Sequence, residues 1–243
     1  MPDQLRHITT LVAAILVAVG LAAAGKFVGD GFRMGRAADR YVTVKGLAER
    51  TVTADLAVWP IRVTATGNDL GAVQSKVDQS VDSLTVFLVG EGLPKEALER
   101  GRVEVNDLMA SPYRPEGADK ARYIIAQTVT VRTAEVDKVR TASARTGELV
   151  KLGVVFGDTG GPVYAFTGLN EIKPEMIAEA TKAARAGAEQ FAADSGSSVG
   201  AIRQANQGVF TIGGREGVGA ALADGEVEKR VRVVSTIEFF LVE

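Results

Sequence analysis

The sequence predicts an α+β protein with mixed, mostly antiparallel sheets, helices packed on one face, and a single transmembrane helix at the N-terminus. Three observations lead to this class. A long uncharged segment lies near the start of the chain, and several strand-like segments follow one another through short connections, which favours antiparallel pairing. Three further segments repeat apolar residues at spacings of three and four, as amphipathic helices do. From residue 41 the expected order is strand, strand, helix, strand, strand, helix, strand, helix, strand, strand.

Residues 8–25, ITTLVAAILVAVGLAAAG, carry no charge. Eighteen helical residues at 1.5 Å each come close to the bilayer core of about 30 Å. A signal peptide is the main alternative, because Ala22 to Ala24 supply small residues at a cleavage position. The apolar run is longer than a typical signal core, so we predict an uncleaved anchor. A buried core helix is a third interpretation, which the missing polar face disfavours.

The flanking charges bear on orientation. Lys26 and the arginines after it outnumber Arg6, and the positive-inside rule would keep that side cytoplasmic. A large C-terminal domain can be translocated despite such charges. We therefore expect residues 1–7 in the cytoplasm, residues 26–40 as a juxtamembrane linker, and residues 41–243 as a periplasmic α+β domain of a single-pass inner-membrane protein.

The first strands occupy residues 41–65. Apolar residues alternate through Val52, Ala54, Leu56 and Val58, but the parity then changes to Ile61, Val63 and Ala65. Pro60 lies at the change and has no N–H to donate to a sheet. We predict a bent strand with a bulge or an edge position at Trp59–Pro60.

Two predicted helices and two predicted strands follow. Residues 70–89 form the best amphipathic pattern, capped by Asn68 or Asp69 and ended by Gly90 and Gly92. Strands are expected over residues 103–109 and around Ile125 to Val131, and a helix over residues 134–150. The inward side chains of that helix are predicted to be Val136, Val139 and Leu149.

The third predicted helix covers residues 174–194, with Pro174 in its first turn and Gly196 after its end. Its alanine-rich stripe indicates a close approach to a sheet. The stripe comprises Ile177, Ala180, Ala184, Ala188 and Phe191, with Met176 at its margin. Residues 199–212 and 228–242 are predicted to be the last two strands.

Composition removes several kinds of chemistry. The sequence has no cysteine, and its one histidine is His7, next to the apolar N-terminal segment. A thiolate nucleophile, a zinc–thiolate site and a Ser-His-Asp triad within the domain are thereby excluded. With 28 basic and 30 acidic residues, the net charge of −2 gives no reason to expect nucleic acid as a partner.

The remaining candidate sites have simpler interpretations. Residues 213–226, GGREGVGAALADGE, lack the lysine and hydroxyl residue of a P-loop and predict a hairpin loop, while residues 157–162 predict a turn. The aromatic side chain of Trp59 is expected to pack in the core. The basic residues Lys229, Arg230 and Arg232 are expected on the solvent face of the last strand or against another subunit.

One cluster of carboxylates could do acid–base chemistry. Asp107, Glu116 and Asp119 lie near the loop that holds Tyr113 and Arg114. No nucleophile, base and orienting group converge there in the sequence. We therefore predict no catalytic, cofactor-binding or metal-binding residues, and a protein that is not an enzyme.

A resemblance to a known family is carried by YVTVKGLAERTVTADLAVWPIRVTATGNDL at residues 41–70, by RYIIAQTVTVRT and the helix after it, and by IRQANQGVFTI. In these segments the chain resembles the SIMPL-domain family of bacterial envelope proteins. It implies a periplasmic or membrane-anchored α+β domain, ring-like homo-oligomers and a role in envelope or oxidative stress. The family has no defined catalytic residues to transfer. Our hypothesis is a non-enzymatic, membrane-anchored protein that self-assembles; the alternative is a periplasmic module that binds a small molecule or a peptide.

Overall fold

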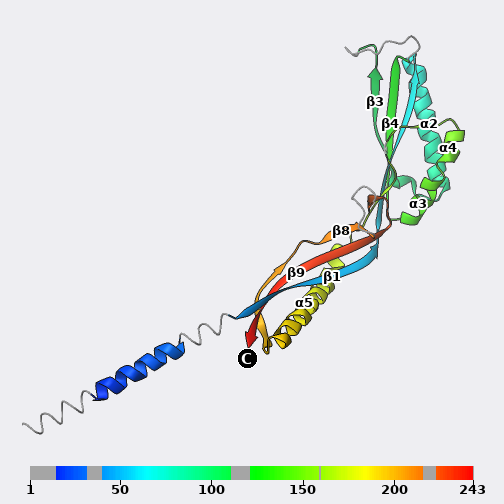
Figure 1. Cartoon of the computed structure of the whole chain (residues 1–243). Coiled ribbons are helices and arrows are strands. Elements are labelled where there is room, and N and C mark those ends of the chain that lie inside the picture. Colours follow the sequence, from blue (N-terminus) through cyan, green and yellow to red (C-terminus); the bar gives the residue numbers. More distant parts are fainter. Residues whose placement is uncertain (1–14, 32–39, 111–120, 159, 216–222, 243) are drawn as a thin grey trace, which may run out of the picture. The chain divides into compact units, whose positions relative to one another are not determined.

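The computed structural model describes residues 15–31, 40–110, 121–158, 160–215 and 223–242 (Figure 1). The chain divides into two compact units. The first contains Met1–Ala48, Ile177–Val209 and Val234–Glu243, and the second contains Glu49–Met176 and Phe210–Val233. The α+β class with antiparallel sheets is confirmed.

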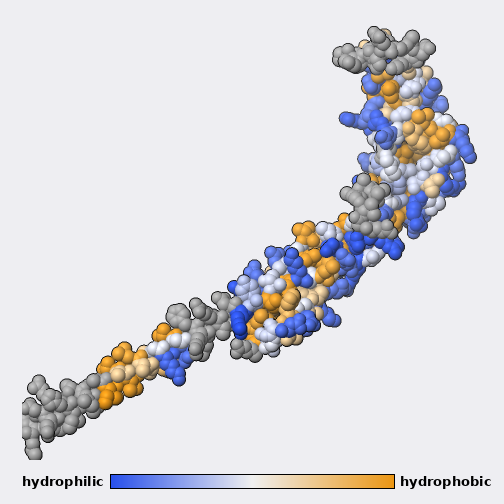
Figure 2. All heavy atoms as spheres, viewed as in Figure 1, coloured by the Kyte–Doolittle hydropathy of each residue, from blue (hydrophilic) through white to orange (hydrophobic). Residues whose placement is uncertain are grey.

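The N-terminal helix covers residues 15–31, and its surface is largely hydrophobic (Figure 2). The predicted anchor at residues 8–25 therefore begins outside the described residues. Within the described part of the chain, no helix is both long and apolar enough to cross a membrane. The predicted linker at residues 26–40 is helical as far as residue 31, and its residues 32–39 are not described.

The first unit contains most of a sheet with strand order β1-β9-β7 and one long helix. The strands are β1 (Tyr41–Thr53), β7 (Ser198–Gln207) and β9 (Glu228–Val242), and β8 (Thr211–Gly214) pairs with the start of β9. From Ile177 onward, α5 (Leu169–Asp194) covers one face of this sheet (Figure 1). The core between them is a cluster of small and large side chains: Val44, Ala184, Ala188, Ile237 and Phe239.

The predicted close approach of the alanine-rich helix to a sheet is confirmed at Gly46. A Cβ added to this glycine of β1 would lie 1.8 Å from the carbonyl oxygen of Ala180 and 2.7 Å from the nitrogen of Ala184. Only glycine fits at this contact. The buried stripe of α5 differs at its end from the prediction, because Ala192 is buried whereas Phe191 is 62% exposed.

The start of α5 was predicted wrongly. The helix begins at Leu169, five residues before the predicted start, and Pro174 lies inside it. The carboxylate of Asp55 accepts hydrogen bonds from the backbone N–H groups of Thr167 (2.8 Å) and Gly168 (3.0 Å). This distant acidic group stabilises the helix start, and the helix tolerates the one backbone hydrogen bond that Pro174 cannot make.

The second unit is built on an antiparallel sheet with the order β3-β4-β2-β5, in which β6 also pairs with β2. The strands are β2 (Leu56–Gly67), β3 (Leu98–Asp107), β4 (Tyr123–Thr133), β5 (Val155–Phe156) and β6 (Val163–Ala165). Its helices are α2 (Leu70–Gly90), the short η1 (Lys95–Ala97), α3 (Val136–Ala144) and α4 (Gly147–Lys151).

The helix predicted over residues 70–89 is confirmed as α2. Asp69 accepts a hydrogen bond from the backbone N–H of Ala72 at 2.7 Å, and Gly92 follows the end with a φ of 84°. One stripe of α2 packs into the core against the odd-numbered residues of β2 and β4. Its buried members are Val73, Val77, Val81, Leu84 and Leu88.

The predicted bulge at Trp59–Pro60 is wrong. Pairing between β2 and β4 continues without a shift through Trp59↔Val131 and Pro60↔Thr130. The parity changes instead at Ala54 and Asp55, which separate β1 from β2. The predicted edge position is correct in part. On the side of β2 away from β4, β6 pairs with residues 56–58 and β5 pairs with residues 63 and 64. Pro60 lies in the gap between these two partners.

Two other predicted elements are each divided in the structure. The helix predicted over residues 134–150 is α3 followed by α4, because thirteen helical residues make about 3.6 turns and would place Leu149 nearly opposite Val136. Both side chains are buried, so the chain must break between them. The strand predicted over residues 199–212 is β7 followed by β8, and the break includes Gly208, whose added Cβ would lie 2.4 Å from the carbonyl oxygen of Val234.

Candidate functional site

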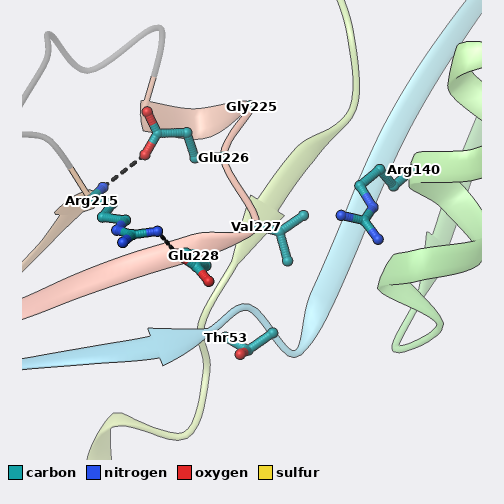
Figure 3. A pocket seen from close by; sticks show the side chains of 7 residues that line it. All are labelled: Thr53, Arg140, Arg215, Gly225, Glu226, Val227 and Glu228. Carbon is teal, nitrogen blue, oxygen red and sulfur yellow. Dashed lines mark hydrogen bonds and ion pairs between the residues drawn. The ribbon is translucent and has the colours of Figure 1, made fainter.

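Charged side chains converge on a cleft in the second unit (Figure 3). Thr53 comes from the end of β1, Arg140 from α3 and Arg215 from the segment after β8, and residues 225–228 lead into β9. The cleft has a volume of about 420 Å³. Its geometry gathers two guanidinium groups and two carboxylates on one surface.

The two guanidinium groups already have acidic partners. The guanidinium of Arg215 bonds to the carboxylate of Glu228 at 2.7 Å, and the backbone N–H of Arg215 donates to Glu226 Oε2 at 2.7 Å (Figure 3). Arg140 pairs at 2.9 Å with Asp137, which does not line the cleft. The contacts of Arg215 hold the ends of the β8–β9 hairpin together, and neither guanidinium is free to bind an anionic substrate.

Lys229 was predicted on the solvent face of the last strand or against another subunit, and this is wrong because the side chain is buried within the chain itself. Its side chain shares the inward parity of Val231 and is only 4% exposed. The ammonium donates hydrogen bonds to the backbone carbonyls of Ala223 and Asp224. Burial lowers the pKa of Lys229 from its usual value. The other two basic residues of the run, Arg230 and Arg232, are less buried.

The carboxylate cluster suggested by the sequence reduces to Asp107, since Glu116, Asp119, Tyr113 and Arg114 lie outside the described residues. Arg122 donates to both oxygens of Asp107, the shortest contact being 3.0 Å, and the backbone N–H of Met109 donates at 2.9 Å. These donors lower the pKa of Asp107. A carboxyl group that is stabilised as an anion is unsuited to general acid catalysis at neutral pH.

The loop predicted at residues 213–226 lies between β8 and β9, which pair antiparallel with Gly214 opposite Lys229. Its residues 216–222 are not described. In the part of the chain that the structure describes, no group of three histidine, cysteine, aspartate or glutamate side chains could hold a metal ion. The described residues therefore show neither a phosphate cradle nor a metal centre.

A second cleft combines two features that the sequence analysis interpreted as structural. Trp59 is in the core, 4% exposed, as predicted, yet it also lines a cleft of about 350 Å³. From the turn predicted at residues 157–162, which lies between β5 and β6, the residues that line the same cleft are Gly157, Gly160, Gly161 and Pro162. No sequence pattern indicated this site, because its residues come from β2, the end of α3 and a connection between two very short strands.

Two comparisons with known proteins complete the description. The SIMPL family model, described as a protein of unknown function (DUF541), matches residues 42–237. This match covers more than half of the chain and nearly all of the two sheets. No curated protein matches the chain.

Proposed function

The chain belongs to the SIMPL family, and we propose that it is a non-enzymatic, membrane-anchored envelope protein that assembles into a homo-oligomer. The observation that carries the proposal is the outer edge of β1. Among the described residues, β1 is the end strand of its sheet and pairs only with β9. A long strand with one unpaired edge is a template for pairing with another chain.

The direction of the backbone groups of β1 supports this use. The carbonyl of Arg40 accepts a hydrogen bond from the N–H of Leu241 on β9 at 2.9 Å. Because successive residues of a strand direct their backbone groups to opposite sides, Thr43, Lys45 and Leu47 direct theirs to the outer edge. Leu47 is also 44% exposed, so an apolar side chain is available beside these groups.

The other two long edge strands are less suited to regular pairing. The register of β3 shifts between Arg100 and Val103, and the register of β7 shifts twice between Val199 and Gln204. Such bulges twist an edge and interrupt its row of hydrogen-bonding groups. If β1 of one copy paired with β7 of the next despite these shifts, the two copies would use different surfaces. Such a head-to-tail contact is the arrangement that can close into rings.

The membrane part of the proposal rests on the uncharged sequence at residues 8–25, with residues 1–7 in the cytoplasm and the α+β domain in the periplasm. The resemblance to envelope-stress proteins suggests the setting in which such an assembly would act. Several anchors on one assembly would hold it at the membrane more firmly than a single short helix.

Light scattering of the full chain in mild detergent tests the assembly. We expect a mass well above that of one 25.5 kDa chain. Lys45→Pro removes the outward N–H of one residue of β1 and should lower the mass, because the edge can no longer form a continuous ladder. Lys45→Thr is the matched control, since it removes the same charge but keeps the N–H. A wild-type chain that stays monomeric at micromolar concentration would contradict the proposal.

A further inference from the structure

The cleft beside Trp59 lies where the outer edge of β2 is not paired. It sits in the second unit, between β5 and β6, with Ile61 and Phe156 as apolar lining. Its volume of about 350 Å³ is in the range of pockets that hold small molecules. Pro60 offers no N–H at this gap, so an added strand would find an incomplete row of partners. The site is therefore better suited to a small molecule than to an extended peptide.

The indole N–H of Trp59 makes this cleft more than a surface hollow. Only 4% of the residue is exposed, yet the N–H has no hydrogen-bond partner among the described residues. Buried tryptophan nitrogens usually have a partner. Among the described residues, Ser235 Oγ is the side-chain polar atom that is both shielded from solvent and without a hydrogen-bond partner. The indole nitrogen of Trp59 also lacks a partner, so it must keep some contact with solvent. Trp59 lines the cleft, which is where we place this contact.

The other polar side chains of the cleft are two hydroxyl groups that already donate hydrogen bonds within the chain. Thr146 Oγ1 donates to the carbonyl of Ser143 at 3.2 Å, and Ser143 Oγ donates to the carbonyl of Arg140 at 2.9 Å. Ser143 also makes a side-chain hydrogen bond with Tyr164, so Thr146 is the hydroxyl with clear acceptor capacity. Among the side chains that line the cleft, Trp59 thus presents a donor to a ligand, and Thr146, at the start of α4, presents an acceptor.

The rim is formed by a connection whose backbone is held in place. The N–H of Gly157 donates to the carbonyl of Arg62 at 2.8 Å, and a Cβ at Gly157 would lie 2.9 Å from Cδ of Arg62. Gly157 therefore lies directly against Arg62 of β2. Gly160 has a φ of 69°, which favours glycine.

None of the described residues that line the cleft is charged. A charged ligand would lose its hydration without gaining a counter-ion. We propose that this cleft binds a small neutral molecule with an apolar body and one group that both accepts and donates a hydrogen bond, such as an alcohol or a carboxamide. Its oxygen accepts from Trp59, its N–H or O–H donates to Thr146, and its apolar body covers Ile61 and Phe156. This site does not depend on the proposed assembly.

Trp59 is the only tryptophan of the chain, so its fluorescence reports on this cleft alone. The test is a titration of the full chain in detergent with cyclohexanecarboxamide, which does not absorb where tryptophan does. We expect a saturable fluorescence change, and binding of cyclohexanecarboxylate that is at least about 10-fold weaker, because its charge has no partner. Absence of a saturable change, or equal binding of the carboxylate, would overturn the proposal.

A matched pair of variants locates the binding. Thr146→Val removes the acceptor and should weaken carboxamide binding about 5-fold, the effect of losing one neutral hydrogen bond. Thr141→Val is the control, because the Thr141 hydroxyl also donates to its own helix, at 2.9 Å to the carbonyl of Asp137, but does not line the cleft. Thermal unfolding verifies that both variants fold. Equal affinities for Thr146→Val and Thr141→Val would place the ligand elsewhere and refute the assignment.

Discussion

Replacing Gly46 by alanine tests the packing of α5 on its sheet. The added Cβ would lie 1.8 Å from the carbonyl oxygen of Ala180 and 2.9 Å from the carbonyl carbon of the same residue. Ordinary contact would require the helix and β1 to separate by about 1.6 Å. The obstructing atoms are backbone atoms of a helix, so no rotation of a side chain can relieve the overlap.

The expected effect is a loss of about 3 kcal/mol in the free energy of unfolding, at the upper end for overpacking, because the whole alanine stripe must lift. Ala180, Ala184 and Ala188 are fully buried under β1 and β9 and would lose contacts together. Urea denaturation followed by circular dichroism measures the difference. Gly187→Ala is the control. Gly187 lies on the same helix, but apart from the neighbouring helix backbone no described atom lies within 4 Å of its added Cβ.

The control should change stability in the opposite direction. Alanine in place of a helical glycine is expected to stabilise by about 0.5–1 kcal/mol, since the unfolded chain loses conformational freedom. A Gly46→Ala variant that unfolds at the same urea concentration as the wild type would refute the close approach. A Gly187→Ala variant as unstable as Gly46→Ala would show that helix packing is not the cause.

Three further predictions follow from single groups. Ser235→Ala should raise the free energy of unfolding by about 1 kcal/mol in the same urea assay, because its buried hydroxyl lacks a partner; a loss of stability would show that the hydroxyl is satisfied. Lys229 has a lowered pKa in the folded state, so between that pKa and 10.5 the unfolded chain binds more protons than the folded chain, and the free energy of unfolding rises with pH. Lys229→Met should lack this part of the pH dependence. Identical pH profiles for the wild type and the variant would contradict the burial. The carboxyl of Asp107 should titrate below 3.8 by NMR and move upward in Arg122→Gln, so its stabilising effect is present at neutral pH and is lost as the pH falls through its folded pKa; an unchanged titration in the variant would rule out the pairing.

Regular periodicity accounts for the parts of the fold that could be predicted. In α2 the residues from Val73 to Leu88 return to one face every three or four positions, and in β9 Val231, Val233, Ile237 and Phe239 alternate. Both elements have one buried and one exposed face, so their apolar pattern reports directly on their geometry. Local sequence is sufficient in such cases.

Two of the errors have a non-local cause, and the third comes from hydrogen bonds that periodicity does not report. The start of α5 is stabilised by Asp55, more than a hundred residues earlier in the chain. Pro60 looked like a bulge because the parity changes near it, but β2 stays regular and the missing N–H falls at a gap between two partner strands of only two and three residues. Lys229 is buried because its ammonium donates hydrogen bonds to the backbone carbonyls of Ala223 and Asp224, which precede it by six and five residues. The partners of α5 and β2 lie outside any short window of sequence, and the alternating pattern of β9 gives no sign of the hydrogen bonds that Lys229 makes.

The cleft beside Trp59 shows the same limit for function. A buried tryptophan and a glycine-rich turn each have an ordinary structural role, and both have that role here. What makes them a candidate site is that the indole N–H has no hydrogen-bond partner among the described residues and that the hydroxyl oxygen of Thr146, at the start of α4, can accept one. Both are properties of the three-dimensional neighbourhood, so reading residue types in order could not reveal them.

Assembly and ligand binding can be separated experimentally because their residues belong to different compact units. Lys45 lies in Met1–Ala48 of the first unit, whereas Trp59 and Thr146 lie in Glu49–Met176 of the second. Lys45→Pro should therefore lower the mass of the assembly and leave carboxamide affinity unchanged. Thr146→Val should weaken carboxamide binding and leave the mass of the assembly unchanged. If Lys45→Pro also abolished binding in a folded chain, the cleft would depend on contacts between subunits, and the site could not be the self-contained pocket described above.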